Sequence, residues 1–481
     1  MSSSSGARVN AKAETFPVPL RDRMLARDLE RRRVQFAIGR ENGTQMAPQH
    51  TLALPGAAPY ERAVATAAGV SAQKERVQWL PLAALKSHVS TWQALADNAL
   101  EPNVFYEPGF ALAAAEVFGR DAGAFTVWAA DEPRRLIGLF PARTERRYGF
   151  GPRVLVGWTH PYAPLGLPLV DRTAATAAIG AWLDHLADAD LPRAMLLPLL
   201  PEGAFADALR AALARRGGQS TAYDEHRRAL IVPGPHRADY LANAVGKKVR
   251  KELARKLRRV GDQAQVAFTV ATAPDEVHAA LDEFFALEAA GWKGRRGTAA
   301  DRLPAVRAFM RQAAENLVPA GKVRIDRLTV DGRAIAATLV LRSGDTVWGW
   351  KTAYDEDYAR TSPGVQIMCW LTEALLADPS IARVDSCAAP DHPMIDHLWR
   401  ERLVLGDLMF TADPRASSEF ALATRLETMR RRLIGTAKVV RNRLRRKKPS
   451  ANGESPLPAT ERAGNGGPRH RPTPAPAASV G

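Results

Sequence analysis

The chain has very little cysteine, with only Cys369 and Cys387 among its 481 residues. Two cysteines cannot supply the disulfide framework of a small secreted protein. Their distance in sequence also does not fit a metal site built from paired cysteines. The sequence therefore favours a reducing compartment.

Long apolar runs are also missing. No stretch reaches the roughly 18 consecutive apolar residues that a membrane-spanning helix needs, although 46% of the residues are hydrophobic, enough for a substantial core. Residues 1–10 are rich in serine and lack the apolar segment of a secretory signal. We expect a cytoplasmic protein that is neither exported nor inserted in a bilayer.

The net charge of +16 is unevenly distributed. Residues 247–259 and 430–448 carry essentially all of the positive excess, so the rest of the chain is close to neutral. Residues 1–75 and 451–481 lack the apolar periodicity of a packed core, and we expect them to be largely disordered, the first of them basic.

The region between these ends repeats one order of elements. Alternation of apolar and polar residues predicts strands, and apolar residues three or four apart predict helices. The pattern predicts strand, strand, helix, strand, helix, strand over 76–240, and the same order with one additional strand over 262–412. Asp331-Gly332 favours a tight hairpin turn in the second copy. We predict a mixed α/β fold (α+β mixed sheets) of two tandem lobes, the second ending with a strand over 403–410.

Two basic helices complete the organisation. A connector over 241–261 has a narrow apolar stripe of Val249, Leu253 and Leu257 among charged residues. A second basic amphipathic helix is predicted over 413–450. Either helix can be a solvated surface without a dedicated partner, or can bind an anionic membrane surface.

Ser362-Pro363-Gly364 precedes an almost uncharged helix in the second lobe. Serine is a favoured N-cap, proline suits the first helical position, and glycine leaves room for a ligand near the backbone. Unpaired N–H groups and the helix dipole favour an anion such as a diphosphate. The same three residues can equally well start an ordinary core helix.

This order of motifs resembles the GNAT acyltransferases, in particular the tandem-GNAT branch associated with cellulose and exopolysaccharide biosynthesis (CelD/BcsL-like), which is related to Fem-type transferases. The resemblance runs from about residue 79 to residue 410. It is carried by the predicted hairpin and the residues that follow it, by the basic connector, and by two short N-terminal segments. These motifs are Lys351-x-x-Tyr354-Asp355, Ser362-Pro363-Gly364, Trp92-Gln93-Ala94-Leu95 and Asn103-Val104-Phe105-Tyr106-Glu107-Pro108.

The resemblance implies that the second lobe binds acetyl-CoA or another acyl-CoA, without a metal, between strands 346–351 and 381–385. The acceptor, a small molecule or glycan, would attack the thioester directly. In the first lobe, residues 162–168 occupy the position of the Ser-Pro-Gly motif and do not match it. We expect this lobe to shape the acceptor site without binding cofactor. The implied cofactor-binding residues are Arg360, Ser362, Pro363, Gly364 and Val365, and the implied substrate-binding residues are Trp350, Lys351 and Tyr354.

The candidate bases are Asp391, His392 and Asp385, because they follow the strand whose end should face the thioester. Relatives often have a Tyr-Lys pair where this chain has Met394 and Ile395. Alternatives remain for this segment. Asp385 can cap a strand and His397 can pack inside a helix; Cys387 can be a nucleophile beside His392; and Asp391, His392, Asp396 and His397 can bind a metal.

Two rival functions share these features. A Fem-like transferase would use aminoacyl-tRNA as donor and hold the RNA with the basic connector. A non-catalytic accessory protein would dock its basic helices on the inner face of a membrane, beside a polysaccharide synthase. Nucleic acid is expected as a partner only if the protein is a Fem-like transferase. The acceptor cannot be named from the sequence.

Overall fold

The computed structural model describes residues 75–130, 134–149, 151–188, 190–234 and 237–447. The predicted disordered tails, 1–75 and 451–481, lie outside these residues except for Glu75. The chain divides into two units, Met1–Arg430 and Arg431–Gly481, and the boundary falls within one long helix. Among the described helices, none is long and apolar enough to cross a bilayer.

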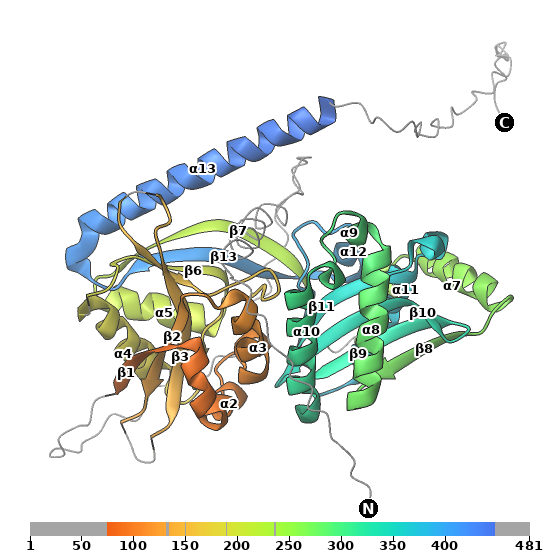
Figure 1. The fold of residues 1–481 in the computed structure, drawn as a ribbon, viewed down its shortest axis with the longest axis horizontal. Coiled ribbons are helices and arrows are strands. Elements are labelled where there is room, and N and C mark those ends of the chain that lie inside the picture. The colour runs from red at the N-terminus through yellow and green to blue at the C-terminus, as the bar shows by residue number, and fades with distance from the viewer. Residues whose placement is uncertain (1–74, 131–133, 150, 189, 235–236, 448–481) are drawn as a thin grey trace, which may run out of the picture. The chain divides into compact units, whose positions relative to one another are not determined.

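Over the described residues, thirteen strands form one mixed sheet in the first unit (Figure 1). The strand order is β1-β2-β3-β4-β6-β13-β7-β12-β11-β10-β9-β8, with β5 beside β3. The prediction of a mixed α/β fold is confirmed. The strands are β1 Arg76–Pro81, β2 Ala122–Trp128, β3 Leu136–Glu145, β4 Val154–Gly157, β5 Leu169–Val170, β6 Met195–Pro201, β7 Gln219–Ile231, β8 Val266–Ala271, β9 Val323–Val330, β10 Arg333–Ser343, β11 Thr346–Tyr354, β12 Arg383–Asp385 and β13 Glu401–Thr411.

Each lobe contains the two helices that the pattern predicted, α4 and α5 in the first and α11 and α12 in the second. It also contains helices that the pattern did not predict, α2 and α3 in the first and α8, α9 and α10 in the second. In the C-terminal part of the sheet, α8 packs on β9 and β10 from one face and α11 packs on them from the other (Figure 1). The α-helices are α2 Val89–Asp97, α3 Pro108–Phe118, α4 Ala175–Asp188, α5 Ala204–Arg215, α6 Tyr240–Ala244, α7 Lys247–Gly261, α8 Pro274–Ala290, α9 Trp292–Arg295, α10 Pro304–Leu317, α11 Pro363–Ala377, α12 Ile395–Leu398 and α13 Ser417–Lys447.

The two lobes exchange strands, which the sequence did not predict. The strand predicted to end the second lobe is β13, and it lies between β6 and β7 in the sheet of the first lobe. In turn, the end of β7 pairs with β12 of the second lobe through Leu230 and Ile231. Periodicity reports which face of a strand is buried and carries no information about which neighbour it pairs with. The boundaries 76–240 and 262–412 therefore do not enclose spatially separate sheets.

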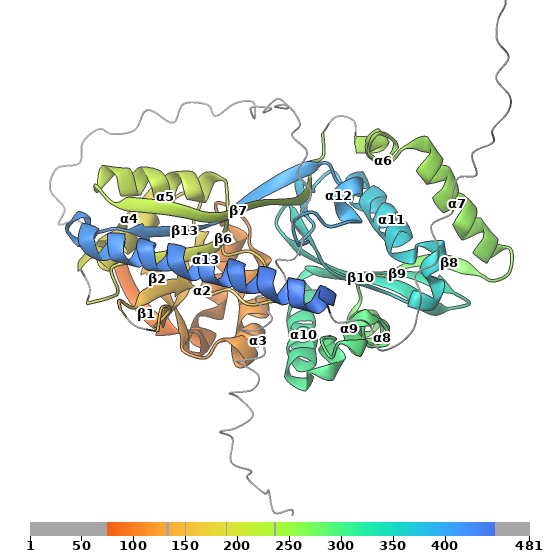
Figure 2. The ribbon, with the colours of Figure 1, turned by 90° about the horizontal axis from the view of Figure 1, so that it is seen from above.

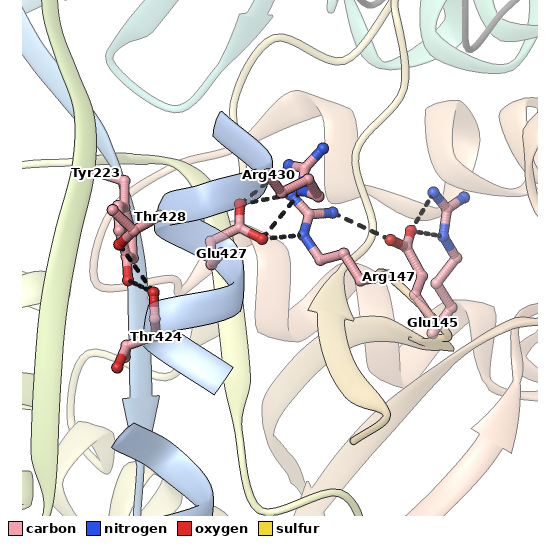
Figure 3. Close-up of polar contacts among 8 residues, drawn as sticks. Glu145, Arg147, Tyr223, Thr424, Glu427, Thr428 and Arg430 are labelled. Carbon is pink, nitrogen blue, oxygen red and sulfur yellow. Dashed lines mark hydrogen bonds and ion pairs between the residues drawn. The ribbon is translucent and has the colours of Figure 1, made fainter. Parts of the chain in front are cut away.

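The N-terminal half of α13 is fixed to the first lobe by a buried carboxylate (Figure 3). Glu427 accepts hydrogen bonds from Arg147 Nε at 2.8 Å and from Arg430 Nη2 at 3.0 Å. Tyr223 donates to the carbonyl oxygen of Thr424 at 3.2 Å. Burial raises the pKa of Glu427, but the hydrogen bonds from Arg430 and Arg147 outweigh it and hold the pKa well below its ordinary value. The carboxylate is therefore charged when the protein is folded.

Candidate functional site

Strands β11 and β12 are parallel neighbours that separate after a short contact. Their register ends at the pair Trp348 and Asp385, and β11 continues for six more residues while β12 stops. The chain after β12 turns away at Cys387, which has a φ of 53°. Its N–H donates to Asp385 Oδ1 at 3.0 Å. Beyond residue 348, β11 therefore has an edge that β12 does not pair with.

The same part of β11 contains a bulge. The register with β10 pairs Leu339 with Lys351 and Val340 with Gly349, so Trp350 is an extra residue on β11. A bulge bends a strand and redirects the side chains next to it. Trp350 is buried and donates from Nε1 to the carbonyl oxygen of Tyr162, in the first lobe, at 2.9 Å. This places Trp350 in the contact between the lobes, so touching an acceptor would require its ring to leave that contact.

Helix α11 begins beside the end of β11. Ser362 occupies the N-cap position in the left-handed conformation, with φ 57°, and its side chain does not cap the helix as expected. Its carbonyl oxygen accepts from the N–H groups of Val365 and Gln366, both at 3.0 Å. Pro363 has no N–H, and among the described residues no acceptor is found for the N–H of Gly364. One backbone donor at this helix start is therefore free to meet a ligand.

The glycine in this motif also permits a close contact within the protein. A Cβ at Gly364 would lie 3.2 Å from Cδ1 of Tyr354, which is tighter than ordinary van der Waals contact. Tyr354 is 38% exposed and ends β11. The side-chain position that we expected to admit a ligand therefore faces the tyrosine ring, and a ligand would have to approach Gly364 from its N–H side.

Lys351 follows the bulge and lies among charged and aromatic groups. Its Nζ is 4.1 Å from the centroid of the Tyr162 ring. Burial, and then the positive charge of Lys293, lower the pKa of Lys351 to about 8. Lys293 itself donates to the buried carboxylate of Glu288 at 2.7 Å. Lys351 is therefore an amine that loses its proton near physiological pH.

The sequence suggested Lys351 as a substrate-binding residue but gave no sign of these neighbours. Glu288 belongs to α8 and Lys293 to α9, more than fifty residues before Lys351. The only local signal is a single acidic residue in the apolar run at the end of α8.

The expected bases occupy different environments. Asp385 is buried and paired with the buried Arg228 guanidinium. Because it also accepts the Cys387 N–H, its lone pairs are largely used. Asp391 is exposed and has a φ of 55°. Asp385 thus holds the β12 turn in place, and a role for it as the base would require breaking the ion pair.

His392 caps the start of α12. Its Nδ1 accepts from the N–H groups of Met394 and Ile395 at 3.3 and 3.4 Å. Burial lowers the pKa of His392, so the neutral ring dominates at pH 7, with its proton on Nε2. In that form neither nitrogen has a free lone pair for a substrate proton.

The structure also bears on the other three interpretations of this segment, which concern His397, Cys387 and a metal site. His397 lies in α12 but is exposed, so the alternative that it lies on the packed face of a helix does not hold. Burial raises the pKa of the Cys387 thiol well above its ordinary value, which disfavours the nucleophilic thiolate. Within the described ranges, no three His, Cys, Asp or Glu side chains lie close enough to hold a metal ion.

Comparison with known proteins identifies the domain that carries this site. Residues 247–392 match the family model for the acetyltransferase (GNAT) domain. That range contains α7, β11, the start of α11 and the turn after β12. A search of curated proteins finds no match to the sequence.

Solved structures show remote likenesses. FemX has 10% identity over 67% of this chain and 95% of its own, with a TM-score of 0.47. The C-terminal domain of a putative lysylphosphatidylglycerol synthetase from Agrobacterium fabrum has 11% identity over 71% and 96%, with a TM-score of 0.44. A tandem GNAT protein from the clavulanic acid biosynthesis pathway has 14% identity over 70% and 99%, with a TM-score of 0.35. At these scores the likenesses carry no argument about donor or acceptor.

The GNAT resemblance is therefore confirmed for the second lobe, while its exopolysaccharide branch stays a prediction. Acyl-CoA is the co-substrate of this family in general. The chain contains a GNAT acetyltransferase domain and is an acyltransferase of that type.

Proposed function

We propose that this protein transfers an acyl group, most simply acetyl, from acyl-CoA to an amine or hydroxyl of a small-molecule or glycan acceptor. One observation carries the proposal. The edge of β11 that β12 leaves unpaired ends at Tyr354, whose ring lies beside Gly364 at the start of α11, and the Gly364 N–H is free. A thioester lying along this edge would reach a helix start that favours its diphosphate.

The residues at the helix start fit the phosphate end of the donor. Gly364 offers a backbone donor, and the exposed Arg360 offers a positive charge in the turn before the helix. Ser362 and Val365 flank the free N–H, and Pro363 fixes the start of the helix. When bound, acyl-CoA supplies an acyl group that is activated as a thioester, and the thiolate of coenzyme A is a good leaving group.

Lys351 is the best-placed group to receive the acceptor's proton. It lies on the part of β11 that pairs with β10 but not with β12, and its neutral form is accessible because its pKa is about 8. The acceptor's nitrogen or oxygen would form a bond to the acyl carbon, the carbon–sulfur bond would break, and the acceptor's proton would pass to Lys351 Nζ. Asp385 and Arg228 would hold the opposite side of the site in position.

The tests of this function compare donors. Purified full-length protein is incubated with acetyl-CoA and with longer acyl-CoAs, and free thiol is followed with and without an extract of small molecules and glycans. Thiol release above background with one of these donors supports the proposal. Absence of release with every donor, together with absence of acyl-CoA binding by calorimetry, contradicts it.

The wider role proposed here is in polysaccharide or cell-envelope biosynthesis, and it rests on the tandem-GNAT resemblance. The Fem-like alternative predicts that aminoacyl-tRNA protects the protein against thermal unfolding while acetyl-CoA does not.

A second candidate role is docking on an anionic membrane surface through the end of α13. Leu433, Val439 and Val440 are exposed, at 68%, 48% and 49%, and Arg431 and Arg432 are near them in sequence. Exposed apolar and basic residues on one helix fit an anionic lipid surface. Loss of sedimentation with phosphatidylglycerol vesicles after truncation at residue 430 would support this role, and unchanged sedimentation would contradict it.

A further inference from the structure

The basic connector helix α7 is fixed against the start of α11. Gln366 of α11 donates from Nε2 to the carbonyl oxygen of Leu253 at 2.7 Å, and both residues are buried. Figure 2 shows α7 and α11 as neighbours on the same face of the sheet. Because this contact sets the position of α7 along α11, Lys256, one turn after Leu253, reaches a defined place.

That place is the N-terminus of α11. Lys256 Nζ lies 3.1 Å from Ser362 Oγ, and the lysine is partly buried. In the part of the chain that the structure describes, no carboxylate is within ion-pair distance of this ammonium. The nearest acidic residue along the same helix face, Glu252, is instead hydrogen-bonded to Arg255 Nε at 2.8 Å. Lys256 thus donates to a neutral hydroxyl, and the carboxylate of Glu252, which interacts with its charge at longer range, is hydrogen-bonded to Arg255.

This arrangement is electrostatically unfavourable in the absence of an anion. The start of a helix carries a partial positive charge, so a cation placed there is disfavoured. Arg360 adds another positive side chain one turn before the helix. An anion at this point would be stabilised by the helix dipole, by the Gly364 N–H and by both side chains.

We propose that Lys256, supplied by the connector helix, is a phosphate-binding residue of the acyl-CoA site and contacts the diphosphate of the coenzyme. This inference rests on the proposed function. It gives the connector a defined task, because the segment that separates the two lobes in sequence also completes the donor site. It also explains why one lysine of a largely solvated helix is held against Ser362.

The test uses titration calorimetry on the full-length protein with CoA, dephospho-CoA and pantetheine. Lys256→Gln removes the charge and leaves a polar side chain that is one atom shorter, and Lys256→Arg keeps the charge. Lys251→Gln, at an exposed position of the same helix, is the matched control. Circular dichroism and the melting temperature of each variant confirm that it is folded.

Lys256→Gln should weaken the binding of CoA and of dephospho-CoA by about ten- to a hundredfold, the range of one charge-assisted hydrogen bond. Lys256→Arg should retain most of the affinity, and Lys251→Gln should match the wild type. Pantetheine, which has no diphosphate, should bind both glutamine variants and the wild type equally. The difference between Lys256→Gln and wild type should also shrink as salt is raised, because the contact is partly exposed.

The outcomes separate this inference from the function on which it rests. If wild type binds CoA and Lys256→Gln binds it equally well, Lys256 has no role in phosphate binding and the inference is overturned. An equal loss for dephospho-CoA and pantetheine would show a general distortion of the site and would also overturn it. If the wild type binds no CoA at all, the proposed function itself fails.

Discussion

Replacing Lys351 tests the proposed proton transfer. With a pKa of about 8, the neutral fraction of Lys351 is about 9% at pH 7 and about 91% at pH 9. If the neutral amine accepts the acceptor's proton, kcat/KM should rise about tenfold over this interval and level off above it. The assay is thiol release from acetyl-CoA at fixed ionic strength, with a hydroxyl acceptor so that the acceptor itself does not titrate.

Lys351→Met removes the amine and keeps an apolar chain of similar length. It should lower kcat/KM by about 10²- to 10⁴-fold, the usual worth of a positioned general base, and the remaining activity should lose the rise between pH 7 and 9. The affinity for CoA should change little, since the diphosphate site lies at the other end of the donor.

Replacing Lys293 tests the role of Lys351 independently. The positive charge of Lys293 is one cause of the lowered pKa of Lys351. Lys293→Met should therefore raise the pKa of Lys351 and move the midpoint of the rate profile to higher pH. A wild-type profile that is flat from pH 7 to 9, or a Lys351→Met profile with the same midpoint as wild type, would refute the assignment.

Three further predictions concern the framework of the site. Glu427→Gln should lower the free energy of unfolding by about 3–5 kcal/mol, because it removes the buried negative charge to which Arg147 and Arg430 donate. The exposed Glu419→Gln should have little effect in the same urea titration. Because the pKa of Glu427 is lowered in the folded protein, its contribution should be complete above its ordinary value of 4.5 and decrease as the pH falls below that value, so wild type and variant should converge in acid melting curves. Arg228→Met should lower the free energy of unfolding in urea by about 3–5 kcal/mol, because it leaves Asp385 buried and unpaired. A double variant that also removes the Asp385 carboxylate should recover part of this loss. Equal stability of the single and double variants would contradict this. Gly364→Ala should weaken CoA binding in calorimetry, because the methyl group would press on the Tyr354 ring beside the free N–H; unchanged affinity would show that the ring moves aside without affecting the site.

The local pattern of the sequence predicted much of the fold. Asp331 and Gly332 do form a hairpin turn with positive φ at both residues, as the pair indicated. The strands around it and the helix after Ser362 also lie where periodicity placed them. These elements are determined by side chains close in sequence, which is the information that periodicity contains.

Features that depend on distant residues were not predictable in this way. The insertion of β13 between β6 and β7 requires pairing across about two hundred residues, and nothing in the alternation of Leu403 and Leu405 selects those neighbours. The lowered pKa of Lys351 depends on α9, and the position of Lys256 depends on Gln366. Asp385, a candidate base chosen by its proximity to β12, likewise pairs with Arg228, which is more than a hundred residues away in sequence.

The most direct test of the donor site is hydrogen–deuterium exchange with and without CoA. The account predicts slower exchange in peptides that contain Gly364 and in those that cover the turn at Cys387, because the coenzyme would occupy the edge between β11 and β12. Binding of CoA with no protection of either segment, or with protection confined to the first lobe, would contradict the placement of the acyl-CoA site.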